Sequence, residues 1–304
     1  MKKALLALGL LFSFSGTSAE RGEVIKHLTD TSVTVRANSG YSRSEGSATL
    51  FKRKVWMDDN STRMVVFALS AAHVVSHLRS TRDEITKDGK PRKVVEYSNP
   101  QLVRKLRNPD TGRIVGEVVV DAKIIKYSDA DTGHDLVIMQ VLADDFELKR
   151  GAVMYPKDGK LIPVGTHMFH VGSLMGDGGA GSLTDGILSA HGRLLHGKIE
   201  LTQSTLVAFP GSSGGGCFLD DGRLVGVLVR GTPTQGFNLH VPTKRLWRFA
   251  EKSKTEWLFD HSIKVTQSEI DDLLVEDTAG AGGSKSNSKS YPFLIRRELI
   301  NQPK

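Results

Sequence analysis

Three polar residues of this chain stand in local sequences that could support nucleophilic catalysis. Ser213 lies in the run GSSGG at positions 211–215, where glycines on both sides permit a tight turn and close approach of a substrate backbone. His73 lies in SAAHVV after an apolar run, and Asp135 opens the apolar run DLVIMQV. A serine nucleophile needs a general base, and the base needs an acid to orient it. The three residues could therefore form a Ser-His-Asp hydrolytic site.

Several alternatives apply to the glycine-rich run. By itself it favours a Gly/Ser surface turn, and Ser212 could be the nucleophile if the turn is shifted by one residue. The two glycines directly after Ser213 favour Ser213 over Ser212. Asp135 follows His73 by 62 residues and precedes Ser213 by 78, so each residue can come from a separate part of the fold. The order His, Asp, Ser argues against an esterase with an α/β-hydrolase fold, in which the order is Ser, acid, His.

The elements that must position these residues are mainly strands. Short runs rich in β-branched residues recur between Gly, Asn, Asp and Ser, at residues 32–37, 47–53, 64–70, 117–127, 135–141 and 223–231. Many short strands of this kind favour a sandwich or barrels. Residues 77–116 are charged and poorly patterned, so we expect long loops there. Residues 242–252 begin with proline and carry apolar residues at helical spacing, which predicts a closing helix.

Both ends of the chain differ in composition from the body. A basic start, an apolar run and small residues at positions 1–19 predict a signal peptide cleaved after Ala19, with no stable membrane anchor left after cleavage. An exported, periplasmic or secreted protein is therefore expected. Residues 280–290 are rich in Gly and Ser and predict a flexible linker before a short amphipathic end. Residues 268–277 offer one short helix before that linker.

Composition restricts the function classes. The chain is 39% hydrophobic and 25% charged, which is ordinary globular composition. The net charge of +7 is scattered, and no Lys/Arg run interleaved with aromatic residues predicts a nucleic-acid groove. Cys217 is the only cysteine, so no intrachain disulfide can form, and we expect it to be a small core residue. The run DADTGHD before Asp135 lacks the distal ligand of a calcium loop, so neither a metal nor a cofactor is expected.

The motifs together resemble a known family. SAAHVV, HDLVIMQV and PGSSGG look like the His, Asp and Ser motifs of trypsin-like (chymotrypsin-fold) serine proteases. GSATLF, the glycine-rich run VGSLMGDGGAGSLTDGILSAHGR and FNLHVPTKRL are most similar to the bacterial high-temperature-requirement (HtrA-type) branch. The resemblance covers roughly residues 47–250. Only 54 residues follow, too few for the PDZ domain of about 90 residues found in that branch.

The resemblance implies an all-β fold of two six-stranded β-barrels with a C-terminal helix and a flexible tail. It implies that Ser213 is the nucleophile, His73 the general base and Asp135 its orienting acid. The N–H groups of Gly211 and Ser213 would form the oxyanion hole. The expected function is an exported serine endopeptidase that acts on protein or peptide substrates through an acyl-enzyme. The alternative is a protease-fold binding protein that has lost activity.

Two departures from the family pattern affect activation and specificity. Ser212 stands where zymogen-type relatives carry an aspartate, so activation by insertion of a new N-terminus is not expected. Val207 stands where relatives that prefer basic residues carry an acid. With Leu228 and Val229 as apolar pocket walls, we expect cleavage after small or medium aliphatic residues. Arg230, at the end of the same strand, is interpreted as a solvent-facing arginine rather than a substrate ligand.

The expected domain layout has three parts: residues 1–19 as signal peptide, 20–252 as protease domain with two barrels, and 253–304 as a C-terminal extension with the Gly/Ser linker. The sequence leaves the oligomeric state open.

Overall fold

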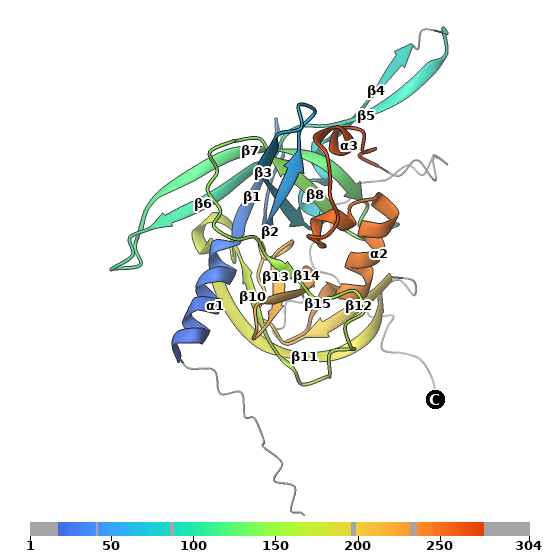
Figure 1. Ribbon diagram of the computed structural model, residues 1–304. Helices are drawn as coiled ribbons and strands as arrows, with labels where there is room; N and C mark the ends of the chain where they lie inside the picture. The colour runs from blue at the N-terminus through green and yellow to red at the C-terminus, as the bar shows by residue number, and fades with distance from the viewer. Residues whose placement is uncertain (1–17, 41, 86–87, 196–198, 232–235, 277–304) are drawn as a thin grey trace, which may run out of the picture.

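Two closed β-barrels dominate the computed structural model, which describes residues 18–40, 42–85, 88–195, 199–231 and 236–276 (Figure 1). The first barrel is antiparallel with strand order β1-β2-β3-β8-β7-β6, and the pairing of β1 with β6 closes it. Its strands are β1 (Ser32–Ser39), β2 (Ser42–Trp56), β3 (Thr62–Ser70), β6 (Gln101–Arg107), β7 (Ile114–Ser128) and β8 (Leu136–Val141).

The second barrel also has six strands in its ring, in the order β13-β10-β11-β12-β15-β14, and the pairing of β13 with β14 closes it. The two-residue strand β9 (Val153–Met154) is added in parallel to the outer side of β14. The ring consists of β10 (His167–Gly172), β11 (Ser182–Leu195), β12 (Ile199–Ser204), β13 (Gly216–Leu219), β14 (Arg223–Gly231) and β15 (Asn238–Pro242). The expected fold of two six-stranded barrels is therefore confirmed.

The expectation of long loops across residues 77–116 is wrong. Two strands there, β4 (Arg79–Ile85) and β5 (Pro91–Tyr97), form a hairpin that projects from the first barrel (Figure 1). Strand β4 is exposed along its whole length, so it has no alternation of apolar and polar residues that a sequence could display. The third strand, β6, is basic at its end because Lys105 and Arg107 bind the second barrel, through Asp177 Oδ2 and Ala180 O.

Short helices lie at the two ends of the described chain. Helix α1 (Ser18–Asp30) contacts the second barrel, where Val24 and Leu28 approach Gly222. Helix α2 (Thr243–Ser253) begins after Pro242 as expected, and α3 (Gln267–Asp271) carries a capping box. The 3-10 turns are Ala72–Val74, Ser76–Leu78, Gly176–Gly179 and Glu256–Leu258. Among the described residues, no helix has both the length and the apolar character needed to cross a bilayer.

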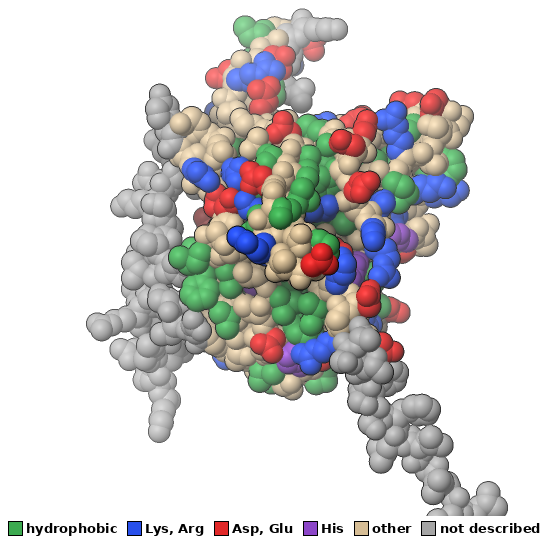
Figure 2. All heavy atoms as spheres, turned by 90° about the vertical axis from the view of Figure 1, so that its left-hand side faces the viewer, with side chains coloured by type: hydrophobic (Ala, Val, Ile, Leu, Met, Phe, Trp, Pro, Cys, Tyr) green, Lys and Arg blue, Asp and Glu red, His purple; other side chains and the backbone are tan. Residues whose placement is uncertain are grey.

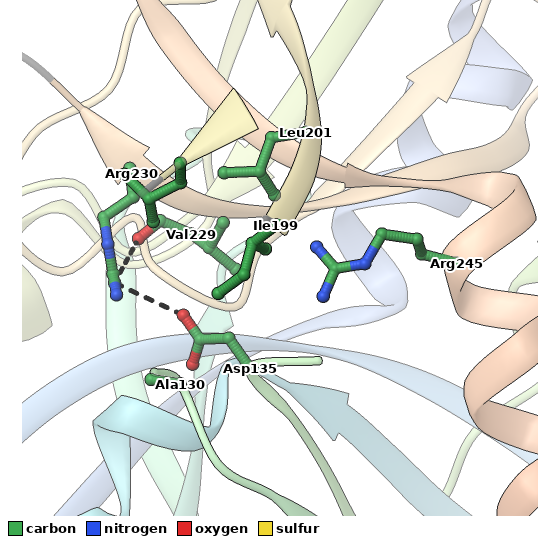
Figure 3. Close-up of a pocket in the computed structure, with 8 residues that line it drawn as sticks. Ala130, Asp135, Ile199, Leu201, Val229, Arg230 and Arg245 are labelled. Carbon is green, nitrogen blue, oxygen red and sulfur yellow. Dashed lines mark hydrogen bonds and ion pairs between the residues drawn. The ribbon is translucent and has the colours of Figure 1, made fainter. Parts of the chain in front are cut away.

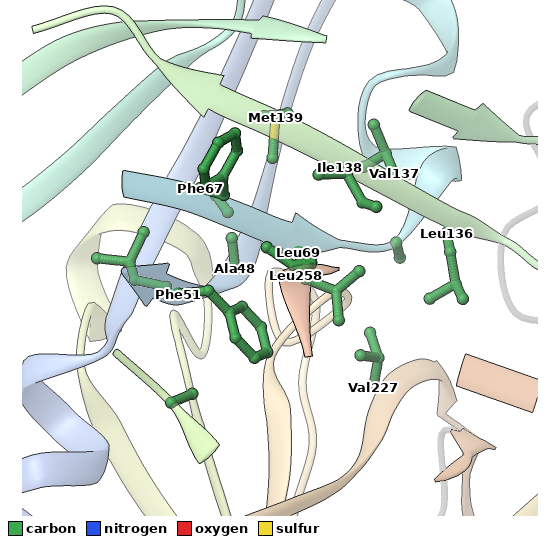
Figure 4. Packing of buried hydrophobic residues seen from close by; sticks show 14 of the residues in the cluster. Ala48, Phe51, Phe67, Leu69, Leu136, Val137, Ile138, Met139, Val227 and Leu258 are labelled. Atoms are coloured by element: carbon green, nitrogen blue, oxygen red, sulfur yellow. The ribbon is translucent and has the colours of Figure 1, made fainter. Parts of the chain in front are cut away.

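The hydrophobic core begins in the first barrel and continues into the second barrel and the C-terminal segment. Figure 4 shows Phe51, Phe67 and Met139 of the first barrel with Val227 of β14 and Leu258 beyond α2. Aromatic rings extend these contacts, since Trp257 packs edge-on against Phe67 with ring centroids 4.9 Å apart. Because both barrels share one core, their relative placement is fixed by packing.

The segment after α2 is also fastened to the first barrel by its backbone. Trp56 N donates to Val265 O at 3.0 Å, and Tyr127 N donates to Val275 O at 2.7 Å. At the end of the described chain, the carboxylate of Glu276 is held by the guanidinium of Arg79. A domain end at residue 252 stays a prediction, and these contacts favour a later end near Glu276. The predicted signal peptide, apart from Ser18 and Ala19, and the predicted linker lie outside the described residues.

The face on the left of Figure 1 is turned toward the viewer in Figure 2. Basic and acidic side chains are interspersed there with hydrophobic ones, over the part of that face that the described residues form.

Candidate active site

Ser213 lies in a tight turn that leads into β13. Gly214, directly after it, has φ +88°, a backbone conformation that favours glycine. A Cβ at Gly214 would also collide with the carbonyl oxygen of Ser47 and the hydroxyl of Ser70. Glycine is therefore required at this position both by conformation and by the close approach of the first barrel.

The backbone N–H groups of this turn fall into two sets. Those of Ser212, Gly214 and Gly215 donate to backbone carbonyls at 2.9, 2.7 and 3.0 Å. Those of Gly211 and Ser213 donate to no group among the described residues. Unpaired N–H groups are costly unless solvent or a ligand accepts from them, so this pair is available to an incoming oxyanion.

The histidine and the aspartate meet in the first barrel. His73 lies in the 3-10 turn that follows β3, and Asp135 lies directly before β8, the strand paired with β3. His73 Nδ1 is 2.9 Å from Asp135 Oδ2 and 3.0 Å from Oδ1, and the backbone N–H of His73 donates to Oδ1 at 3.0 Å. These contacts hold the proton of the imidazole on Nδ1, which leaves Nε2 as an acceptor.

The Asp135 carboxylate is almost fully buried, with 8% of its side chain exposed. Burial alone would raise the pKa of Asp135, but the contacts with His73, and then with Arg230, lower it by more. The pKa of Asp135 consequently lies below its usual range, and the group is a carboxylate at neutral pH.

Arg230 supplies a second donor to this carboxylate. Its Nη1 donates to Asp135 Oδ2 at 3.3 Å and to Val229 O at 3.1 Å, as the dashed lines of Figure 3 show. The same nitrogen is 3.3 Å from His73 Nδ1. Because Nδ1 already carries a proton toward Asp135, this last contact brings two donors together, and a positive charge lies beside the imidazole.

The nucleophile candidate and the histidine turn are neighbours across the interface between the barrels. Gly46 lies between them, since a Cβ there would come within 3.0 Å of Ser213 O and within 2.6 Å of the Val74 side chain. The Ser213 hydroxyl forms no hydrogen bond with His73 or with any other described residue. Such contacts are often long in the absence of substrate and shorten when it binds.

The four pocket candidates occupy two different environments. Val229 and Arg230 line a small cavity with Asp135, Arg245 of α2 and several apolar residues, among them Ala130, Ile199 and Leu201 (Figure 3). Leu228 is instead buried in a cluster inside the second barrel, and Val207 is half-buried and accepts from Thr184 Oγ1 through its carbonyl. The structure thus brings two of the four together beside Asp135.

The interpretation of Arg230 as a solvent-facing side chain overlooked a bulge. The pairing of β14 with β15 shifts register between Leu228 and Arg230, so strict alternation does not apply there. Leu228 and Val229 are accordingly both buried, at 2% and 3% exposure, and Arg230 turns toward Asp135.

Two further residues close to the site have no local signal in the sequence. Arg245 joins α2 to the loop before Asp135 by donating to Gly133 O at 3.1 Å, and it also donates to Glu200 O at 2.9 Å. Ser47, in β2, forms hydrogen bonds to the nucleophile turn and is discussed below. Within the described ranges, no three His, Cys, Asp or Glu side chains are grouped so as to hold a metal ion.

Fold and site together define a two-barrel protein with a Ser, His and Asp set at the interface of the barrels. A sequence model of the trypsin-like peptidase domain matches residues 55–227, more than half of the chain. The chain belongs to the trypsin-like peptidase domain family.

Several solved structures share this fold. The HtrA-type protease AlgW with a tripeptide is 19% identical, with 78% of this chain and 64% of that chain covered and a TM-score of 0.51. The serine endoprotease from Yersinia pestis is 18% identical, with 79% and 66% covered and a TM-score of 0.50. Deg5 is 19% identical, with 76% and 91% covered and a TM-score of 0.50.

The chain spans slightly less than two thirds of the length of AlgW and of the Yersinia pestis protein. None of the curated proteins compared with the chain matches it significantly.

Proposed function

We propose that this protein is an exported serine endopeptidase in which Ser213, His73 and Asp135 form the catalytic triad. The observation that carries the proposal is the His73–Asp135 pair, whose shortest contact is 2.9 Å. It lies next to a serine turn in which the N–H groups of Gly211 and Ser213 donate to no described residue. Membership of the trypsin-like peptidase family supports the same assignment.

The mechanism follows from these positions. His73 Nε2 takes the hydroxyl proton of Ser213 while Oγ bonds to the carbonyl carbon of the scissile peptide. The negative charge that forms on the carbonyl oxygen accepts hydrogen bonds from the N–H groups of Gly211 and Ser213. His73 then gives the proton to the leaving amine, the C–N bond breaks and an acyl-enzyme remains. A water molecule then attacks the acyl-enzyme through the same steps, and the carboxylic acid product is released.

Asp135 serves this cycle by holding the imidazole with its proton on Nδ1 and by stabilising the imidazolium that forms. Arg230 is itself a cation 3.3 Å from Nδ1, so it repels the imidazolium.

The proposed substrates are proteins or peptides cleaved after small or medium aliphatic residues. Val207 offers no carboxylate that could bind a basic side chain. The proposed export rests on the leader-like residues 1–19. Removal of residues 1–19 would leave a chain that begins at Glu20, inside α1.

Labelling with a fluorophosphonate tests this proposal, because the probe bonds only to an activated serine. The wild type should be labelled and should hydrolyse peptide substrates, and Ser213→Ala should do neither. Ser212→Ala is the matched control. Ser212 is buried, at 1% exposure, and its hydroxyl accepts from Phe209 N–H at 3.1 Å, so a substrate does not reach it and this variant should keep labelling and turnover.

The second candidate is a protease-fold binding protein without turnover. The specific observation in its favour is that the Ser213 hydroxyl forms no hydrogen bond with His73. A folded wild type that binds peptides but is neither labelled nor active would support this candidate and refute the peptidase.

A further inference from the structure

Ser47 is a buried residue of the first barrel whose polar groups all form hydrogen bonds, most of them at the junction with the second barrel. It lies in β2 and its side chain is 0% exposed. Its N–H donates to Ser213 O at 2.7 Å, and its carbonyl accepts from Ser70 Oγ at 2.6 Å. Its hydroxyl donates to Gly211 O at 2.7 Å and accepts from the N–H of Ser173, also at 2.7 Å.

The hydroxyl contact with Gly211 matters because two peptide planes meet at that glycine. Gly211 has φ +92° and carries no side chain that could hold either plane. In a planar trans peptide the C=O and the N–H point in opposite directions, so fixing one fixes the other. Ser47 holds the carbonyl of the plane after Gly211, and the N–H of that plane donates to Phe209 O at 2.9 Å.

The plane before Gly211 carries the N–H group of the proposed oxyanion hole. Its carbonyl, Pro210 O, accepts from Met175 N at 2.7 Å. The Gly211 N–H therefore points away from Met175, and no described residue accepts a hydrogen bond from it. The orientation of this N–H depends on where Met175 is held.

Ser47 also anchors the loop that places Met175. The Ser47 hydroxyl accepts from Ser173 N–H, and Gly176 N donates to Ser173 O at 2.9 Å across a turn in which Met175 has φ +62°. One hydroxyl thus restrains the plane after Gly211 directly and the plane before it through this loop. Thr34 Oγ1 contacts Ser173 Oγ at 2.6 Å and supports the same loop from β1.

We propose that Ser47 is a positioning residue of the oxyanion hole, whose hydroxyl keeps both peptide planes at Gly211 in the orientation that points the Gly211 N–H at the reacting carbonyl oxygen. The proposal rests on the peptidase function proposed above. Ser47 does not touch the substrate, and it acts through Gly211 and through the loop from Ser173 to Gly176.

Ser47→Ala removes this hydroxyl and leaves Ser47's backbone bonds in place. Because loss of a whole oxyanion donor lowers kcat about 10²–10³-fold, partial misorientation of one donor should lower kcat about ten- to a hundredfold. KM should change less than about twofold, since the substrate contacts are untouched. A peptide trifluoromethyl ketone, which binds through a tetrahedral oxyanion, should bind more weakly by the same factor as kcat/KM falls.

Ser70→Ala is the matched control. Ser70 is also a fully buried serine of the first barrel. Its hydroxyl lies beside Gly214 but donates to the carbonyl of Ser47, and it forms no hydrogen bond with residues 211–215. This variant should keep kcat within about threefold of the wild type. Fluorophosphonate labelling run to completion gives the number of competent sites, and kcat is expressed per labelled site, so that a loss of folded protein is not counted as a loss of rate.

The outcomes separate the two proposals. A Ser47→Ala enzyme with a wild-type kcat per labelled site, or with unchanged affinity for the ketone, would overturn the role of Ser47 while leaving the peptidase intact. A wild type that is neither labelled nor active would overturn both. Should Ser47→Ala fail to fold, Ser47→Cys fills the site with a slightly larger side chain that is only a weak donor, and it should lower kcat by a smaller factor.

Discussion

Acid should destabilise the second barrel through two buried histidines. His170 in β10 donates from Nδ1 to Gly216 O at 3.1 Å, and its Nε2 has no partner among the described residues. Burial lowers the pKa of His170 to about 4. Burial, with smaller contributions from His191 and His170, lowers the pKa of His240 in β15 to about 3.

The size of the effect follows from these pKa values. In the unfolded chain each histidine has a pKa of about 6.5, so below that pH the unfolded state binds protons that the folded state does not. Above pH ~6.5 the two histidines do not change the free energy of unfolding with pH. As the pH falls below ~6.5 the free energy of unfolding decreases, and the decrease is complete near pH 4 for His170 and near pH 3 for His240. At pH ~5 the loss is about 2 kcal/mol for each residue, or about 4 kcal/mol together. Typical domains are stable by only about 5–15 kcal/mol.

Urea unfolding at neutral pH and at pH ~5 measures this loss. In His170→Asn the amide can still donate to Gly216 O but does not titrate, so the loss between the two pH values should be about 2 kcal/mol smaller than in the wild type. Any constant destabilisation by the substitution cancels in this difference. An equal loss in both proteins would refute the reasoning.

His167→Asn provides a control of opposite sign. Burial lowers the pKa of His167, but hydrogen bonds with Asp220 and Asp185 raise it by more. His167 therefore stabilises the folded protein below pH ~6.5, and this stabilisation is lost as the pH rises. Removing it should make the decrease in the free energy of unfolding between neutral pH and pH ~5 larger.

Other expected outcomes follow from the contacts of the site and of the chain end. Asp135→Asn should lower kcat per labelled site about 10⁴-fold, because the amide no longer holds the imidazole proton on Nδ1. Gly214→Ala should lower the melting temperature by at least about 5 °C, since the new Cβ collides with the first barrel. Truncation after Ala279 should leave folding and small-peptide turnover intact because it keeps Glu276, whereas truncation before Glu276 should lower the melting temperature.

Local patterns predicted many short strands, in a sandwich or in barrels, and the three candidate catalytic residues. The two barrels were implied by the family resemblance that the motifs carry. His73 follows an apolar run and Asp135 opens one, and the motifs around these two residues and Ser213 are short. The same reasoning gave a wrong prediction for residues 77–116. An exposed hairpin has no buried face. Lys105 and Arg107, at the basic end of β6, contact Asp177 and Ala180 of the other barrel as well as Glu117 and Gly112 of their own.

The supporting residues of the site were missed for a related reason. Ser47 is 126 residues from Ser173 and 164 from Gly211, so nothing in its neighbourhood indicates its partners. Arg230 was misassigned because alternation along β14 breaks at a bulge that depends on the register with β15. Both errors concern interactions between segments far apart in the chain, which local patterns do not encode.

The reactivity of Cys217 can report how often the second barrel opens. The thiol lies in β13, four residues after Ser213, with β10 and β14 on either side. It is 0% exposed, and burial raises its pKa, so the closed protein presents no reactive thiolate. As the only cysteine, it can react with a thiol reagent only when β13 separates from its neighbours. The rate of that reaction would measure how often the second barrel opens, without any introduced probe.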